Sequence, residues 1–314
     1  MPARKISFEE AWDSSIVFLM DSELEREIQS IVDQLVETAK HPAVSEGAVI
    51  DVRGIREFLE AEPKALDVIL KDIGLSEERF QRIITLLRKL GRIPGGLDSE
   101  WGMGGIKSRI RRDDEFALLV ATLLIDGARD PELAQYIPRY YLDALNYRAF
   151  RGSTEESRRI LYESSLIGTR GGKMGYYVER RIRTKLDAIG KKYGVGYGCG
   201  KWPVVDTNID IAIPTVDDPY VIIMSSFNET TSSGQSVKAR GMCSIYDQIR
   251  HFNSHNRQDR AFVNFVDGGG WLARRTDFRR LVDECHYFLN FHHLDMLEDI
   301  VLQHVPKEYF NRQG

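Results

Sequence analysis

The chain lacks the features that would place it in several large classes of protein. It has three cysteines in 314 residues, Cys199, Cys243 and Cys285, and no two of them form a CxxC pair. This spacing supports neither a zinc site nor a disulfide framework, and it is typical of a reducing compartment. No apolar run approaches the roughly 20 residues that a membrane-spanning helix needs. The N-terminal sequence MPARKISFEEAWDSS also lacks the apolar core of a signal peptide. We therefore expect a cytoplasmic protein without a membrane partner.

A global excess of positive charge is also absent. The chain has 43 basic and 47 acidic residues, which gives a net charge of -4. This balance does not exclude DNA binding, because a local basic groove can act against an acidic remainder. No GxSxG elbow supports a serine hydrolase, and the GVGYGCG run does not follow a strand, so a connecting loop is favoured over a dinucleotide site. His251 and His255 are four residues apart, but no Asp–His strand pattern accompanies them, which favours surface or structural roles.

Hydrophobic spacing divides the chain into two halves. Apolar residues recur at helical intervals through the first half, and Gly and Pro separate these segments. Short apolar runs typical of strands occur only in the second half. We predict an all-helical domain over residues 1–150 and an α/β domain over residues 151–314. The helices are expected at 22–38, 52–60, 64–73, 76–90, 113–126, 131–148, 158–166, 176–192, 236–252, 278–285 and 294–305, and the strands at 208–213, 220–227 and 261–266.

An acidic residue, Asp210, lies in the first of these strands, within the sequence DTNIDIAIP. A carboxylate between isoleucines costs free energy if it is buried without a partner, and a metal ion is one natural partner. Asn208 and Ala212 share its face of the strand, which leaves room for an ion. The alternative is an aspartate at a strand edge that is solvated or caps a helix. The residues alone leave both interpretations open.

Four segments of the second half carry a family resemblance. They are GYYVERRIRTKL, IDIAIP, YVIIMSSFNETTSSGQS, and FVNFVDGGGWLARR followed by YFLNFHHLDMLEDI. Over about residues 165–300 the chain resembles a type II restriction endonuclease with a PD-(D/E)xK core. The resemblance implies a restriction-endonuclease-like mixed β-sheet flanked by helices. It also implies site-specific hydrolysis of phosphodiester bonds in double-stranded DNA with Mg²⁺, which two carboxylates hold so that it activates water. A homodimer is implied too, because a palindromic site matches a twofold protein.

The second strand departs from the family pattern. Met224 stands where the family places Glu, and Ser226 stands where it places Lys, Asn or Gln. Methionine is a poor ligand for Mg²⁺, because hard cations prefer oxygen. The resemblance makes Asp210 the fixed metal ligand. For the second carboxylate it leaves two candidates. One is Glu229, if a β-bulge turns its side chain toward the site, and the other is Glu179 on the preceding helix.

A replacement carboxylate is one of three interpretations of Met224, and the sequence leaves all three open. In the second, the strand register differs, so that Ser225 or Ser226 binds water. In the third, the site is inactive and the protein binds DNA without cutting it. The simpler interpretation of Glu179 is that it forms a surface ion pair with Arg183, four residues later on the same helix. Glu229 equally suits a turn or a helix cap.

Polar and basic side chains around the second strand are candidates for contact with DNA. Small hydroxyl and amide groups in TTSSGQS can donate hydrogen bonds to phosphates or base edges, although a flexible loop that caps a helix has the same composition. The residues expected to meet DNA are Ser232, Ser233, Gln235, Lys238, Arg240, Arg170 and Lys173. The helical first half is expected to grasp DNA or to support dimerisation.

Two functions other than cleavage stay open. One is a DNA-binding or modification-sensing protein with a degenerate, non-cleaving nuclease core. The other is a helical scaffold that binds a sugar or a protein, and it would show no DNA affinity at low salt.

Overall fold

The computed structural model describes residues 3–94, 99–150 and 154–310, and the chain divides into two compact units. Unit 1 combines residues 1–24 with 169–314, and unit 2 comprises residues 25–168. The sequence predicts one boundary between residues 150 and 151, and residue 151 lies outside the described residues. The division that the contacts define falls after residues 24 and 168 instead. The N-terminal segment therefore belongs with the second half of the chain.

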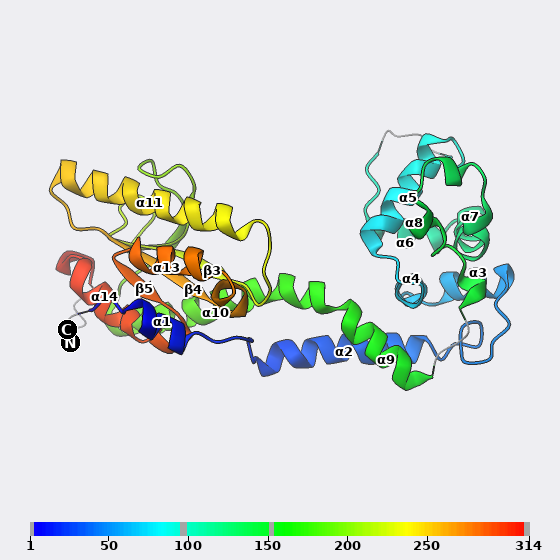
Figure 1. Ribbon diagram of the computed structural model, residues 1–314, viewed down its shortest axis with the longest axis horizontal. Helices are drawn as coiled ribbons and strands as arrows, with labels where there is room; N and C mark the ends of the chain where they lie inside the picture. Colours follow the sequence, from blue (N-terminus) through cyan, green and yellow to red (C-terminus); the bar gives the residue numbers. More distant parts are fainter. Residues whose placement is uncertain (1–2, 95–98, 151–153, 311–314) are drawn as a thin grey trace. The chain divides into compact units, whose positions relative to one another are not determined.

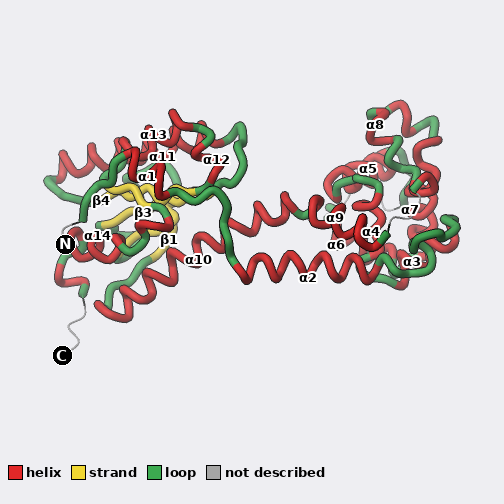
Figure 2. Tube along the Cα trace, turned by 60° about the horizontal axis from the view of Figure 1, so that its bottom comes forward, coloured by secondary structure: helices red, strands yellow, loops and turns green. Residues whose placement is uncertain are grey.

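Unit 2 is helical, as its hydrophobic spacing predicts, and Figure 2 shows it as helices joined by loops. Ser76 caps one helix as predicted, since its hydroxyl accepts a hydrogen bond from Arg79 N at 3.3 Å. The helices are α2 (Ser22–Thr38, which begins in unit 1), α3 (Val52–Ala61), α4 (Ala65–Asp72), α5 (Glu77–Lys89), α6 (Met103–Ile110), α7 (Asp114–Asp126), α8 (Arg139–Leu142) and α9 (Glu155–Ser165).

The single helix predicted over 131–148 is wrong. The structure has short 3₁₀ turns at Leu133–Gln135 and Tyr147–Ala149, with the four-residue α8 between them. Pro138 stands directly before α8. Proline has no N–H to donate and its ring clashes with the preceding turn, so it interrupts a helix that apolar spacing alone would continue.

Unit 1 is built on a mixed β-sheet, and among the described residues the strand order is β1-β2-β3-β4-β5. The β1–β2 and β2–β3 pairs are antiparallel, whereas β4 is parallel to both β3 and β5. This sheet and its flanking helices confirm the α/β class. The strands are β1 (Gly198–Lys201), β2 (Asn208–Ile213), β3 (Val221–Phe227), β4 (Ala261–Asp267) and β5 (Tyr287–Leu289).

Helices cover both faces of this sheet, and Figure 1 shows α11 and α14 on opposite sides of the strands. Ile222 and Met224 of β3 share a buried apolar cluster with Met242 of α11 and Phe278 of α13. Burial of these side chains fixes which face of β3 meets α11. The helices of unit 1 are α1 (Phe8–Ser14), α10 (Ile167–Tyr193, which begins in unit 2), α11 (Gln235–Asn256), α12 (Gly269–Leu272), α13 (Arg275–Asp283) and α14 (Met296–His304).

Two glycine-rich segments belong to regular elements: the GVGYGCG run, expected as a connecting loop, and residues 168–175, which precede the helix predicted over 176–192. Helix α10 runs through residues 168–175, and β1 takes in Gly198 and Gly200. Glycine weakens a helix by about 1 kcal/mol relative to alanine, but Met174 is buried and Arg170 is bonded within unit 1. Tertiary contacts therefore outweigh the local preference in α10. In β1, antiparallel pairing with β2 orders the chain, and a bulge accommodates the positive φ of 142° at Gly200.

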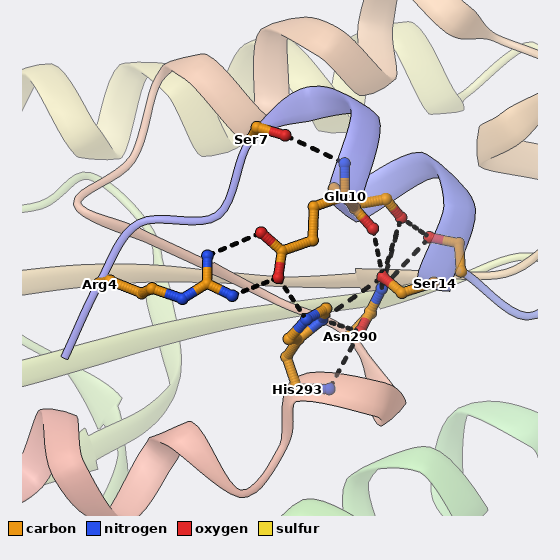
Figure 3. Close-up of polar contacts among 8 residues, drawn as sticks. Arg4, Ser7, Glu10, Ser14, Asn290 and His293 are labelled. Atoms are coloured by element: carbon orange, nitrogen blue, oxygen red, sulfur yellow. Dashed lines mark hydrogen bonds and ion pairs between the residues drawn. The ribbon is translucent and has the colours of Figure 1, made fainter. Parts of the chain in front are cut away.

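The N-terminal segment is tied to unit 1 by aromatic and polar contacts. The Phe8 ring lies edge-on to Phe278, with the ring centroids 6.0 Å apart. Figure 3 shows the Glu10 carboxylate between Arg4 and His293, and its Oε1 lies 3.2 Å from His293 Nε2. The hydrogen bond from the Arg4 guanidinium lowers the pKa of Glu10 to about 2. The contacts with Phe278 and His293 join α1 to distant parts of the chain, with 283 positions between Glu10 and His293, so the local sequence pattern gives no sign of them.

Candidate functional site

Asp210 is held against the neighbouring strand. Its half-buried side chain accepts hydrogen bonds at Oδ2 from Ser225 N at 2.7 Å and from Ser225 Oγ at 3.2 Å. These donors replace the water that burial removes. Asp210 therefore has a protein partner, and a metal ion is not needed to explain a carboxylate in this strand.

The two strand positions that distinguish the chain from the family pattern point into the core. Met224 is 9% exposed and belongs to the apolar cluster beneath α11. Ser226 is 2% exposed, and its hydroxyl accepts a hydrogen bond from Trp271 Nε1 at 3.2 Å. Both side chains have structural roles here, and Ser226 is too deeply buried to meet a solvent-borne substrate.

Glu229 is engaged at both of its carboxylate oxygens. Oε1 accepts from Leu19 N at 2.7 Å, and Oε2 pairs with Arg170 Nη1. Arg170 Nη2 also donates to the Leu19 carbonyl at 2.9 Å. The side chains of Glu229 and Arg170 are only 9% and 19% exposed. The contacts of Glu229 and Arg170 with each other and with Leu19 form a clamp, which holds the N-terminal segment at the end of β3. Glu229 could bind a metal only if this clamp broke.

Glu179 is paired as well. Arg183, one turn later on α10, donates to Glu179 Oε1 from Nη2 at 2.6 Å and from Nε at 3.0 Å. The side chain of Glu179 is 42% exposed and that of Arg183 is 36% exposed. This is the surface pair that the spacing of the two residues indicates.

The donor set for Mg²⁺ is therefore incomplete. Within residues 3–94, 99–150 and 154–310, Asp210 is the only one of the three candidate carboxylates without an arginine partner. Across the described residues, no group of three or more His, Cys, Asp or Glu side chains could hold a metal ion. The resemblance implies two carboxylates at the Mg²⁺ ion, whereas in the described part of the chain Glu229 and Glu179 are paired with arginines and Asp210 alone of the three is not. The described residues therefore do not supply the pair of carboxylates that the resemblance implies.

The loop between β3 and α11 is ordered by its own polar groups. Gln235 is 2% exposed, and its Oε1 accepts from Ser232 N at 3.0 Å. Arg274 donates to the Ser232 carbonyl at 2.9 Å and to Ser236 Oγ at 3.0 Å. Gln235 thus shapes the loop from inside, whereas Ser232 and Ser233 remain exposed. The sequence gives no sign of Arg274, because its partners lie about 40 residues earlier.

Two cations lie on the first turns of α11. Lys238 and Arg240 are exposed, and Arg240 Nε also contacts the Ser236 carbonyl at 3.3 Å. Although the Lys238 side chain is exposed, the protein around its ammonium lowers its pKa, and the charge of Asp210 opposes that change. The Asp210 carboxylate is therefore close enough to Lys238 for its charge to affect the ammonium group. Arg170 differs, because it is committed to Glu229, and Lys173 is half-buried on α10.

Three glycines after β4 let the ends of β3 and β4 approach closely. Gly270 N donates to the Asn228 carbonyl at 2.8 Å. A Cβ at Gly268 would overlap the Asn228 carbonyl oxygen, and one at Gly270 would overlap that of Thr230. The DGGGW sequence thus fixes the path of the chain just before the hydroxyl-rich loop.

Asp267, the last residue of β4, is a buried anchor that sequence reasoning missed. It is fully buried and accepts hydrogen bonds from the backbone N–H groups of Ile16 and Gly268 at 2.8 Å and of Phe291 at 3.0 Å. Burial raises the pKa of this carboxyl to about 6, against the opposing effect of the three donors. An aspartate at a strand end before glycine is the only local signal for this role.

The titration of Asp267 predicts a pH-dependent stability. Because its pKa is higher in the folded than in the unfolded state, the folded state binds a proton more tightly between about pH 4 and 6. The free energy of unfolding should therefore fall as pH rises through this window, by up to about 3 kcal/mol from this group. Urea unfolding followed between pH 4 and 7 measures the slope. The same slope in Asp267→Asn would contradict the assignment.

The polar cluster in Figure 3 has the residue types of a serine hydrolase but not the required bonding. Ser14 Oγ lies 3.4 Å from His293 Nδ1, and His293 Nε2 lies 3.2 Å from Glu10. However, the Ser14 hydroxyl donates to the Glu10 carbonyl at 2.6 Å and accepts from Asn290 Nδ2 at 2.8 Å. His293 Nδ1 also faces Asn290 Oδ1 at 2.9 Å. The serine is therefore not activated as a nucleophile, and the cluster anchors α1.

Comparison with known proteins adds no relative: no protein-family model, no curated protein and no solved structure matches the chain. Within the described residues, no helix is long and apolar enough to cross a membrane.

Proposed function

We propose that the protein binds double-stranded DNA through unit 1 and that its nuclease-like core does not cleave the DNA. The resemblance of residues 165–300 to PD-(D/E)xK endonucleases supports a DNA ligand. The four resembling segments fall in order on α10, on β2, on β3 with the start of α11, and on β4, α12, β5 and α14, so they share one sheet and its flanking helices.

One observation carries the choice of a non-cleaving protein. Both carboxylates that could replace the family's missing Glu are paired with arginines, Glu229 with Arg170 and Glu179 with Arg183. Removing one member of a buried pair leaves an uncompensated charge, which costs about 3–5 kcal/mol. If Glu229 bound a metal, Arg170 would lose its counter-charge, and the free energy of metal binding would have to offset that cost. The paired carboxylates thus favour a degenerate core over an active one.

Metal-dependent hydrolysis by a type II restriction endonuclease remains the second candidate. Asp210 favours it, because this carboxylate is half-buried, has no arginine partner in the described part of the chain, and lies where its charge acts on Lys238. Mg²⁺ is often bound by only one or two carboxylates together with substrate phosphates. A homodimer likewise stays a prediction, and light scattering of the full chain tests it.

The first turns of α11 are the proposed contact with the DNA backbone. The N–H groups at a helix N-terminus favour phosphate, and the exposed hydroxyls of Ser232 and Ser233 adjoin them. Lys238 and Arg240 add positive charge one turn further on. These groups contact phosphates and carry no base-specific pattern of donors, so they position DNA and do not select its sequence.

Removing these two cations should weaken DNA binding. In Lys238→Ala/Arg240→Ala, the slope of log K against log salt should fall by about 2, since each phosphate contact contributes about 1. Gel retardation of a labelled duplex at several salt concentrations measures this slope. The control Lys191→Ala/Lys192→Ala removes the same charge from the far end of α10 and should change the slope less. Equal slopes for both double variants would contradict the proposed contact, and no retention at low salt would favour a scaffold instead.

A further inference from the structure

The C-terminal end of α11 carries two histidines that the proposed DNA contact does not use. His251 and His255 are both exposed, and their ring centroids lie 4.0 Å apart at an interplanar angle of 43°. A spacing of four residues places side chains next to each other on one helix face. The two imidazoles are thus close enough to meet a single ion.

One hydrogen bond fixes which nitrogen of His255 is available. Nδ1 of His255 lies 3.0 Å from the backbone carbonyl of His251. A carbonyl oxygen only accepts, so this nitrogen carries the proton and Nε2 of the neutral ring carries the lone pair. Histidines that bind metals typically donate their other ring N–H to such an acceptor. In the neutral ring of His255, Nε2 is therefore the nitrogen that can bind a metal.

The helix end that carries these rings is held in place. Arg257, in a left-handed conformation with φ 51°, ends α11 through a hydrogen bond from its N–H to the Asn253 carbonyl. Asn253, which lies between the two histidines, donates from Nδ2 to the Arg260 carbonyl at 2.9 Å and accepts from Arg260 N at 3.1 Å. Little order therefore has to be gained when an ion binds. The negative end of the helix dipole also favours a cation here.

We propose that His251 and His255 form a surface site for a divalent transition metal such as Cu²⁺, Ni²⁺ or Zn²⁺. Imidazole suits these ions, and the usual order of affinity places Cu²⁺ above Ni²⁺ and Zn²⁺. The protein supplies two ligands, since the described residues contain no group of three, and water or a partner molecule completes the coordination. Asp247, exposed one turn earlier, adds a negative charge on the same stretch of helix. Mg²⁺ is not expected to bind at this site, because it prefers oxygen donors to imidazole nitrogen.

Calorimetric titration of the untagged full chain with Ni²⁺ tests the site directly. We expect one equivalent to bind, and a loss of affinity of at least tenfold in His251→Ala and in His255→Ala separately. Both variants should keep the circular dichroism of the parent chain, because both side chains are exposed. His255→Gln, which keeps a polar side chain of similar length, should lose binding to the same degree.

The matched control is His292→Asn, which removes a histidine from another part of unit 1 and should leave binding unchanged. In samples loaded with Zn²⁺ in place of Ni²⁺, the chemical shifts of the ring nitrogens should show coordination through Nε2 of His255. Three results would overturn the proposal: no Ni²⁺ binding by the parent chain, unchanged binding in either alanine variant, or displacement of Ni²⁺ by equimolar Mg²⁺.

Discussion

Replacing Arg170 by methionine should lower the free energy of unfolding of unit 1 by about 3–5 kcal/mol. The change leaves the Glu229 carboxylate, 9% exposed, with the Leu19 N–H as its remaining partner among these contacts. It also removes the donor to the Leu19 carbonyl. A buried charge that loses its counter-charge is one of the few single changes with so large an effect.

Urea unfolding of the full chain, followed by hydrogen exchange of peptides from β3 and β4, measures this effect within unit 1. Arg183→Met is the matched control, because it breaks the half-exposed pair with Glu179 on the same helix. The control should cost no more than about 1 kcal/mol. The double variant Arg170→Met/Glu229→Gln should be more stable than the sum of the single changes predicts, because the cost lies in the unpaired charge. Equal losses from Arg170→Met and Arg183→Met would contradict the clamp.

Unit 2 should respond as strongly to the replacement of Arg158 by methionine. Arg158 Nη2 lies 3.0 Å from Asp72 Oδ2, and their side chains are 4% and 0% exposed. Tyr147 and Tyr162 also donate to this carboxylate, at 2.8 Å and 2.9 Å. We expect a loss of about 3–5 kcal/mol, because Asp72 would keep two neutral donors but lose its counter-charge.

The effect of Arg158→Met should also depend on pH. Burial already raises the pKa of Asp72, and Arg158 is the main group that opposes this. Without Arg158 the folded pKa rises further above the unfolded value, so stability is lost as pH rises through that window and recovered as pH falls. Arg159→Met, which breaks the exposed pair with Asp33, is the control and should change stability far less than Arg158→Met at every pH, because exposed ion pairs contribute little. A deficit in Arg158→Met that stays constant from pH 7 to pH 4 would contradict this account.

Elements with strong local periodicity could be predicted from the sequence. The bounds of α2, Ser22–Thr38, and of β2, Asn208–Ile213, agree with the expected ranges. In both segments the hydrophobic spacing and the burial point the same way. The edge strand β1 could not be predicted, because its sequence GCGK has no apolar alternation and pairing with β2 orders it.

The candidate site was less predictable, because its decisive contacts join distant residues. The sequence identifies Asp210 and marks Met224 as a departure, but nothing near Glu229 indicates that Arg170, 59 positions earlier, would pair with it. The N-terminal segment could not be assigned to unit 1 for the same reason. Asp267 binds Ile16 N across 251 positions, and spacing within a short window carries no information on such contacts.

The central claim is that unit 1 holds double-stranded DNA without cutting it. The most direct measurement incubates the protein with a long unmethylated DNA that contains every short palindrome, in Mg²⁺ and separately in Mn²⁺. Electrophoresis before and after removal of the protein then separates retention from cleavage. The account predicts retarded DNA that is intact once the protein is removed, for the parent chain and for Asp210→Ala alike. Discrete fragments that form with the parent chain and disappear in Asp210→Ala would contradict it and establish the endonuclease.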